Sequence, residues 1–470
     1  MRRLITLLAS SLLATAVAHA QAPAYQFYYG TLHSHSGYSD GNQDSTSSGK
    51  STPLQDYQFA AASQHFDFLG ISEHNHSQAG MHLRDFARGR TQATLATTPA
   101  FVALQGTEWG VISGGGHMLL YGIHQLYGWE AGNYDVYVPR NDYQALMRQL
   151  NREPGAFALF AHPQSGDYGN IAGSAAFSPT ADSALVGVPL RSGPATSTST
   201  LYNTMGTSYE STYRAMLAKG YHVGMSLDHD NHNTTFGRTT HGRTVVLAPA
   251  LTEAALLQAL RTRRFYGSDD WNAQVTLTLN GQPMGSVLQG ATAAAVSVTY
   301  ADPDNEPTAS ITLLRGVPGS GVAGVSVAAG TTGAAALTYT DPAVAGTAYY
   351  YAVIVQADGD RIVTSPIWYT RAGALAQTPA QQPASVDVFP NPVVHGQEFT
   401  VAYSLTHTAQ VQVQLLDGIG RVIPALLVDI EQVAGSHTVR VETRNLPAGL
   451  YNLHIIYDGG SAYRKLVVAE

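Results

Sequence analysis

Histidine is concentrated in the first half of this chain, close to carboxylates. Thirteen of the 18 histidines lie between residues 33 and 241, and most of those with an acidic neighbour directly follow a short apolar run. Imidazole and carboxylate groups are suitable ligands for zinc, manganese or iron. The chain contains no cysteine, which excludes a thiolate site. The pattern predicts a site for more than one divalent metal ion.

Six short segments carry the candidate ligands. They supply His33, His35 and Asp40; Glu73 and His74; Glu108; His117; His162; and Asp228, Asp230 and His232. In an extended chain, residues two positions apart point to the same face, so His33 and His35 can bind the same ion. A lone histidine at a strand end is usually an ordinary polar residue. Six such segments in one domain make metal binding the better interpretation.

The elements that must position these segments follow from the apolar pattern. Residues 25–266 alternate short apolar runs with amphipathic stretches, which is typical of repeated βα units. Strands are expected at 27–32, 66–72, 101–106, 117–123, 156–161, 184–190 and 221–227, and helices at 142–152, 208–219 and 252–264. Parallel strands of a βα barrel end at one face, where catalytic groups gather. Substrate selection is expected in loops 77–100 and 164–207.

The chain is expected to contain five parts. They are a signal peptide at 1–20, a metal-binding α/β domain at 21–271, an immunoglobulin-like or fibronectin-like β-sandwich at 272–371, a linker at 372–385 and a second all-β domain at 386–470. The acidic turn from Asp302 to Glu306 has two interpretations, a calcium site or a solvated loop. The solvated loop is the better one, because the three carboxylates fall short of the six to eight oxygens that calcium prefers.

The N-terminus and the net charge limit the possible partners. Arg2 and Arg3 precede an apolar run that ends in Ala18-His19-Ala20, a pattern typical of a secretory signal. No later stretch predicts a transmembrane segment. The formal charge of -8 argues against broad binding to nucleic acid. A small-molecule substrate is expected.

The ordered segments resemble the motifs of the PHP (polymerase and histidinol phosphatase) metallohydrolases over residues 25–270. The resemblance implies a distorted (β/α)7 barrel that holds two or three divalent ions, zinc, manganese or iron. It assigns ligands to each ion: His33, His35, Glu108 and Asp230 to the first; Glu108, His117 and His162 to the second; Asp40, His74 and His232 to the third. Asp228 stays an alternative to Asp230, although Asp230-Asn231-His232 keeps the family's Asp-x-His spacing.

The same resemblance implies a secreted, metal-dependent hydrolase, with phosphoesters as the expected substrates. A metal-bridged hydroxide would attack the substrate, with Glu108, His162 and Asp230 as the catalytic residues. Hydrolysis of carboxyl esters or carbamates is the nearest alternative. A non-catalytic surface-binding protein stabilised by its metals is the alternative from another class.

Several polar residues near the segments stay open. Relatives usually have Asp where this chain has Glu73, so Glu73 is either an outer group or a ligand that reaches differently. The others are His76, His124 and His229, and the arginines Arg238, Arg243 and Arg264, which either clamp an anionic substrate or serve the structure.

The last domain resembles the C-terminal sorting domain of the type IX secretion system. The resemblance rests on residues 388–392, 416–421, 446–451 and 465–468. It implies recognition by the type IX secretion machinery and passage through the outer membrane. The protein is therefore expected to be secreted or held at the cell surface.

Overall fold

The computed structural model describes residues 25–62, 66–112, 115–202, 206–343, 345–372, 386–405, 408–417, 422–457 and 460–470. The expected signal peptide at 1–20 and all but the first residue of the expected linker lie outside these ranges. The chain divides into two compact units, Met1–Gly373 and Ala374–Glu470. With 43% strand and 17% helix, the protein is mostly β.

A long curved sheet organises the first part of the first unit. Its strands lie in the order β11 (Gly224–Ser226), β8 (Leu185–Pro189), β7 (Phe157–Phe160), β4 (Gly116–Tyr121), β3 (Val102–Val111), β2 (Phe68–His74), β1 (Gln26–Thr31), β12 (Arg243–Ala248) and β13 (Phe265–Ser268). Strand β11 also packs against β13. The sheet therefore curls back on itself.

The strand directions depart from the expected all-parallel βα repeat. The pairs β1–β2, β2–β3, β7–β8 and β8–β11 are parallel. The pairs β3–β4, β4–β7, β1–β12 and β12–β13 are antiparallel. Strands β3 and β4 are consecutive in the chain and pair antiparallel, from Thr107–Leu120 to Val111–Gly116. The described residues therefore form a mixed curved sheet, and the expected distorted (β/α)7 barrel is not shown by this strand pairing.

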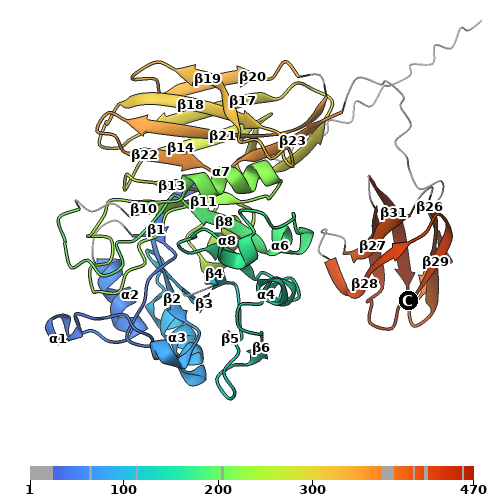
Figure 1. Cartoon of the computed structure of the whole chain (residues 1–470), viewed down its shortest axis with the longest axis horizontal. Coiled ribbons are helices and arrows are strands. Elements are labelled where there is room, and N and C mark those ends of the chain that lie inside the picture. The colour runs from blue at the N-terminus through green and yellow to red at the C-terminus, as the bar shows by residue number, and fades with distance from the viewer. Residues whose placement is uncertain are drawn as a thin grey trace, which may run out of the picture. The chain divides into compact units, whose positions relative to one another are not determined.

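Helices flank this sheet (Figure 1). They are α1 (Ser45–Ser48), α2 (Pro53–Ala62), the 3₁₀ turn η1 (Ser77–Ala79), α3 (Leu83–Ala96), α4 (Tyr143–Leu150), α5 (Asp167–Asn170), α6 (Pro179–Ala184), α7 (Glu210–Lys219) and α8 (Glu253–Arg261). Helix α8 begins after Thr252, whose hydroxyl accepts a hydrogen bond from the Ala255 amide at 3.3 Å. Helix α3 occupies most of segment 77–100, where a loop was expected, because Phe86, Ala93 and Ala96 give it a buried face.

Four two-residue strands pair outside this sheet. They are β5 (Tyr127–Gly128) with β6 (Val136–Tyr137), and β9 (Arg191–Ser192) with β10 (Thr207–Ser208).

Residues 274–371 form a β-sandwich whose first sheet has the order β15 (Gln282–Pro283), β14 (Gln274–Leu279), β17 (Ala295–Ala301) and β20 (Ala336–Thr340). The second contains β22 (Arg361–Thr364), β21 (Gly346–Gln356), β18 (Thr308–Gly316), β19 (Val325–Gly330), β23 (Ile367–Arg371) and β16 (Val287–Gly290). Strands β14 and β17 alternate between buried and less buried side chains, as strands with one covered face do.

The sandwich is joined to the curved sheet within one unit. Strand β13 pairs with β22 through Tyr266–Thr364, Gly267–Val363 and Ser268–Ile362. Helix α7 lies beside the sandwich (Figure 1), where the Tyr213 hydroxyl donates to the Thr364 carbonyl at 2.9 Å. One apolar cluster contains Tyr213 and Leu217 together with Tyr351. The two parts therefore share both a sheet and a core.

The second unit is all β. One sheet has the order β24 (Val386–Phe389), β26 (Glu398–Leu405) and β29 (Gly435–Glu442). The other has the order β25 (Val393–Val394), β31 (Gly460–Ala469), β30 (Gly449–Tyr457), β27 (Ala409–Leu416) and β28 (Val422–Gln432). They enclose an apolar core that includes Phe399, Val413 and Leu453. Among the described residues of the chain, no helix is long and apolar enough to cross a membrane.

Candidate metal centre

The nine predicted ligands lie at one edge of the curved sheet. His33 and His35 follow β1, His74 ends β2, and Glu108 lies near the end of β3. Because β4 runs antiparallel to β3, its start lies at this same edge and carries His117. Of the remaining four, Asp40 lies in the loop after β1, His162 follows β7, and Asp230 and His232 follow β11. Sequence segments up to 199 residues apart are thus brought together by strand order, since residue 33 and residue 232 share the edge.

The first group of donor atoms is closely packed and almost fully buried. His33 Nε2 lies 3.0 Å from Asp230 Oδ1 and 3.2 Å from Glu108 Oε1. His35 Nε2 lies 3.3 Å from Glu108 Oε2 and 3.3 Å from Asp230 Oδ1. The two imidazole Nε2 atoms are 3.2 Å apart. All four side chains therefore direct a donor atom to a common point.

The second group shares Glu108 with the first. Glu108 Oε1 lies 2.8 Å from His117 Nδ1 and 3.0 Å from His162 Nε2. The two histidine nitrogens are 3.3 Å apart. On its other oxygen, Glu108 Oε2 lies 3.2 Å from His74 Nδ1. Glu108 can therefore bridge two ions.

The third group surrounds Asp40 at the more open side of the centre. Asp40 Oδ1 lies 3.5 Å from His232 Nε2, 3.6 Å from His74 Nε2 and 3.9 Å from His35 Nδ1. The Asp40 side chain is 43% exposed, whereas that of His35 is 0% exposed. The centre is therefore open to solvent on the Asp40 side.

The spacing of these atoms fits divalent metals. Ligands about 2.1 Å from a tetrahedral ion are about 3.4 Å from one another, which matches the separations of 2.8–3.3 Å in the first two groups. His74 Nδ1 is buried and has no hydrogen-bond partner, although it faces Glu108. Three imidazole and carboxylate sets here, His33/His35/Glu108/Asp230, His74/Glu108/His117 and His35/Asp40/His74/His232, each keep their donor atoms within 4.8 Å.

The protonation states of the centre also favour cation binding. Burial would raise the pKa of Glu108, but the imidazoles of His117 and His33 hold that pKa well below its usual range. Burial lowers the pKa of His74 to about 3, so this imidazole is neutral and able to ligate. The carboxylates raise the pKa of His35 to about 10, against the effect of burial. A metal that binds His35 must therefore displace a proton.

The structure separates the roles of Asp228 and Asp230. Asp228 is fully buried and accepts from the Leu32 amide at 3.4 Å and the Ser226 hydroxyl at 3.1 Å. Asp230 points into the first group and has a left-handed backbone with φ 51°. That conformation is uncommon outside glycine and is held by the pairing of Ser34 with Asn231. Asp230 is therefore the carboxylate that faces the other ligands.

Glu73, whose role the sequence left open, holds the loop that carries Asp40. It is fully buried and accepts from the Ser36 amide at 3.2 Å. The hydroxyls of Ser36 and Ser39 also donate to its carboxylate. Among the described residues, Glu73 thus acts on the loop backbone and lies outside the donor groups.

The other open residues divide into structural and neighbouring ones. Arg243 is fully buried and donates to the carbonyls of Gly237 and Gly242 at 3.1 and 2.7 Å, which argues against its use as a substrate clamp. His229 is hydrogen-bonded to the Gly242 carbonyl, and His124 is hydrogen-bonded to Arg90. His76 differs, because its ring centroid lies 5.6 Å from that of His74 and 5.8 Å from a ring of Trp129. Trp129 had no signal in the sequence, since only the fold brings it here.

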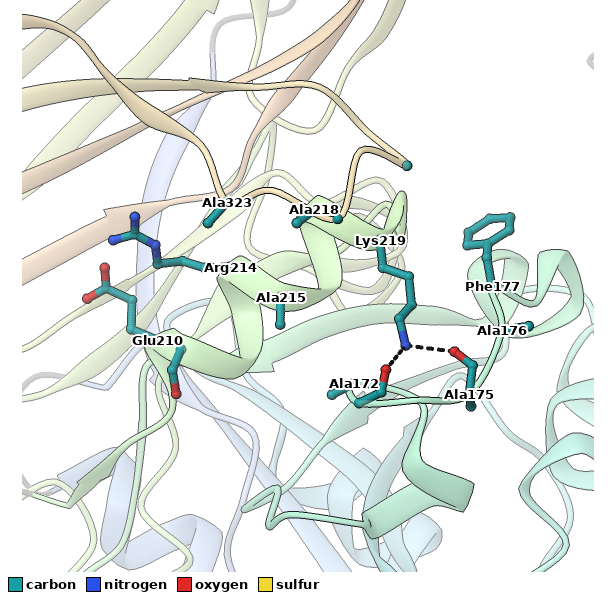
Figure 2. Close-up of a pocket in the computed structure, with 14 residues that line it drawn as sticks. Ala172, Ala175, Ala176, Phe177, Glu210, Arg214, Ala215, Ala218, Lys219 and Ala323 are labelled. Carbon is teal, nitrogen blue, oxygen red and sulfur yellow. Dashed lines mark hydrogen bonds between the residues drawn. The ribbon is translucent and has the colours of Figure 1, made fainter.

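Figure 2 shows a separate hollow beside α7, lined mainly by alanine and glycine. Its Lys219 Nζ already donates to the carbonyls of Ile171 at 2.6 Å and Ala175 at 2.8 Å. Its Glu210 pairs with Arg361 at 2.6 Å. The hollow contains none of the predicted ligands, and its charged groups serve the fold.

Comparisons with solved structures find matches at low sequence identity. Fibronectin(III)-like modules of Clostridium thermocellum CbhA match with 15% identity over 41% of this chain and 94% of theirs, with a TM-score of 0.19. The FN1-FN3 domains of chicken CNTN1 match with 13% identity over 39% of this chain and 63% of theirs, with a TM-score of 0.16. A Parabacteroides merdae β-glucuronidase matches with 15% identity over 42% of this chain and 25% of its own, with a TM-score of 0.18. TM-scores this low support no assignment of fold.

The search of curated proteins finds no match to the chain. The C-terminal unit, however, matches a family model. Residues 387–469 match the family of secretion system C-terminal sorting domains. This range covers nearly the whole predicted domain at 386–470, and it supports export to the exterior or the cell surface. The chain therefore ends in a type IX secretion C-terminal sorting domain.

Proposed function

We propose that residues 25–271 are a PHP-type metal-dependent hydrolase that acts outside the cell on phosphoesters. The observation that carries the proposal is the convergence of nine imidazole and carboxylate side chains into overlapping donor groups. A purely structural metal site needs one closed set of ligands, whereas a catalytic centre keeps an accessible position. The exposed Asp40 side provides that access.

The residues have distinct tasks in this proposal. The first ion would be held by His33, His35, Glu108 and Asp230. The second would be held by Glu108, His117 and His162, and the third by Asp40, His74 and His232. Divalent ions bound here supply Lewis acidity and lower the pKa of a bound water to about 7. The buried Glu108 keeps its negative charge because the surrounding imidazoles favour its ionised form. Asp40 and His232 border the side from which a substrate approaches.

The assignment to phosphoesters rests on the resemblance of the ordered motifs to the PHP family. The centre itself would serve carboxyl esters and carbamates equally, because these also need a polarised oxygen and an activated water. The ring of His76 lies between those of His74 and Trp129 and adds an aromatic group next to the centre.

The test combines metal analysis with a substrate panel. The purified chain is measured by elemental analysis and assayed on a phosphomonoester, a phosphodiester, a carboxyl ester and a carbamate. We expect two or three zinc, manganese or iron ions per chain and turnover of a phosphoester. Glu108→Gln and His33→Ala/His35→Ala should lose at least about a hundredfold in turnover, since even residues outside the ligand set often cost 10–100-fold.

A matched control keeps the result interpretable. His124→Ala removes an exposed imidazole that bonds to Arg90 away from the centre, and it should keep both metal and turnover. Turnover of only the carboxyl ester or carbamate would retain the hydrolase and reject the phosphoester assignment. Fewer than one ion per chain, with no turnover after zinc, manganese or iron is added, would favour a surface-binding protein.

A further inference from the structure

Three turns of the first unit bring carboxylates together. These turns are distant in sequence from the residues of the histidine centre. The turns follow β13, join β17 to β18, and join β21 to β22. Donor oxygens of Asp270, Asp302 and Glu306 all lie within 4.8 Å of one another. Asp270 is only 6% exposed, so the group is partly withdrawn from solvent. The strand pairing of the sandwich therefore supplies a cluster that no single turn could provide.

Further acidic residues surround this cluster. Asp304 lies in the same turn as Asp302, and Asp358 and Asp360 lie in the β21–β22 turn. The Asp358 amide donates to Glu306 Oε1 at 3.1 Å, which places the two turns against each other. Among the ion pairs of the described residues, none joins a lysine or arginine to these carboxylates. The neighbouring Asp269, by contrast, is paired with Arg191 at 2.6 Å.

Two buried amide side chains contact the same cluster, and each has an oxygen without a hydrogen-bond partner. Asn272 and Gln356 are 5% and 0% exposed, and neither Asn272 Oδ1 nor Gln356 Oε1 has a hydrogen-bond partner. The nitrogens of the same two amides donate to cluster carboxylates, Asn272 Nδ2 to Asp304 Oδ2 at 2.9 Å and Gln356 Nε2 to Asp302 Oδ2 at 3.1 Å. Buried polar atoms usually have a partner, so these two oxygens are available to ligate a cation.

The electrostatics of the cluster point the same way. Burial, with the charge of Asp302, raises the pKa of Asp270. Burial, with the charge of Asp358, raises the pKa of Asp360 to about 7. Like charges that repel one another in a partly buried place reduce stability unless a cation compensates them. The pKa directions agree with the geometry, although the geometry alone identifies the place.

The donor set selects the kind of cation. It contains only oxygen, from carboxylates and neutral amides, which a hard cation prefers. Two amide oxygens and three carboxylates, of which at least one binds through both of its oxygens, reach the six to eight ligands of calcium. Magnesium demands a stricter octahedron and usually keeps several waters. The acidic turn, which by itself indicated a solvated loop, gains its missing ligands from Asp270, Asn272 and Gln356.

We propose that Asp270, Asp302 and Glu306, with the amide oxygens of Asn272 and Gln356, form a calcium site. The ion would tie the β17–β18 and β21–β22 turns to the segment that leaves β13. It would therefore fasten the sandwich to the sheet that carries the histidine centre. Calcium sites of extracellular modules have dissociation constants of about 10⁻⁴–10⁻³ M. The proposal is independent of the hydrolase function.

The test is calcium titration of the purified chain after treatment with EGTA, followed by calorimetry and by thermal melting. Four variants accompany the wild type: Asp302→Asn/Glu306→Gln, the single Glu306→Gln, His33→Ala/His35→Ala, and the control Glu398→Gln in the C-terminal unit. We expect one calcium per chain in the wild type, the histidine variant and the control. Affinity should fall at least tenfold in the double variant and less in the single variant.

Melting separates lost calcium binding from lost folding. In EGTA, Asp302→Asn/Glu306→Gln should melt no lower than the wild type, because it removes repelling charges. In calcium, only proteins with the intact site should gain in melting temperature. Equal calcium binding by the wild type and the double variant would overturn the proposal. It would also be overturned by no binding up to about 10 mM, ten times the weakest constant expected, or by loss of binding in the histidine variant.

Discussion

Glu108 is the residue on which the geometry of the histidine centre depends. Its two oxygens lie 2.8–3.3 Å from five imidazoles, those of His33, His35, His74, His117 and His162. A carboxylate in this position can bridge ions only if its neighbours keep it charged, which the imidazoles do. The residues that surround a ligand and set its charge or orientation are therefore worth testing as well as the ligand itself.

Glu73→Gln tests such an orienting residue. The carboxylate of Glu73 accepts from the Ser36 amide and the hydroxyls of Ser36 and Ser39, which lead to Asp40. An amide cannot accept all of these bonds, so the loop should loosen and turnover should fall about 10–100-fold. Elemental analysis should show a loss of about one ion, with the ions at His33 and His162 retained. An unchanged ion content and turnover would show that the loop needs no such anchor.

Asp56→Asn tests a buried carboxyl group that is not one of the predicted metal-ligating residues. Asp56 is fully buried, accepts from Asn42 Nδ2 at 2.8 Å, and has one oxygen without a partner. Burial raises its pKa well above the usual value. The unfolded chain releases this proton near pH 4, so wild-type stability falls as the pH rises from there to the folded-state pKa, by about 1.4 kcal/mol per pKa unit.

Asparagine removes that dependence. Chemical denaturation at several pH values should show the stability difference between Asp56→Asn and the wild type growing in favour of the variant above pH 4. A difference that stays constant with pH would mean that Asp56 ionises as easily in the folded protein as in the unfolded one.

At the scale of the element, the β3–β4 hairpin carries both Glu108 and His117. Gly110 in β3 has φ +122°, and a Cβ there would lie 2.4 Å from the Gly116 carbonyl oxygen. Gly110→Ala should therefore destabilise the first unit by about 1–3 kcal/mol and reduce the ion content at His117 and His162. Thermal melting and elemental analysis measure the two effects.

Gly132→Ala is the matched control for the hairpin. Gly132 has φ +81°, but a Cβ there would meet nothing within 4 Å. It should cost only the backbone strain and leave the ions in place. Equal losses in both variants would show that the positive φ, and not the close approach of β3 to β4, limits the site.

At the scale of the whole molecule, the boundaries expected near residues 271 and 372 have different physical meaning. The curved sheet continues into the sandwich through β13–β22, and Arg361 pairs with Glu210 of α7 at 2.6 Å. Residues beyond 373 belong to a separate compact unit. The first boundary cuts a shared core, whereas the second divides two compact units.

Two truncations test this difference. A chain that ends at residue 372 should melt at the same temperature as the first unit of the full protein and keep its ions. A chain that ends at residue 271 should be unfolded or aggregate, because it exposes the edge of β13 and the apolar surface around Tyr213. Circular dichroism and size-exclusion chromatography measure both outcomes. A folded 25–271 fragment with its ions would show that the sandwich is dispensable.

The sequence by itself predicted the elements whose signals are local. The expected helix at 252–264 is α8, because a capping threonine and an apolar face lie within a few residues. The sorting domain also followed from its motifs. The hairpin β3–β4 was expected as parallel strands, because strand direction depends on the connection and not on the apolar run that predicts a strand.

For the candidate metal centre, too, some features could be predicted from local sequence and others depended on the tertiary structure. Residue type and spacing marked the six segments, because ligand chemistry is a property of single residues and of neighbours two positions apart. The resemblance to the PHP family then selected nine side chains from them. Tertiary structure decided that Asp230 faces the centre while Asp228 does not, that Glu73 holds a loop, and that Arg243 is structural. It also joined the acidic turn at Asp302 to Asn272 and Gln356. These outcomes depend on contacts between distant segments, which only the packing of the chain creates.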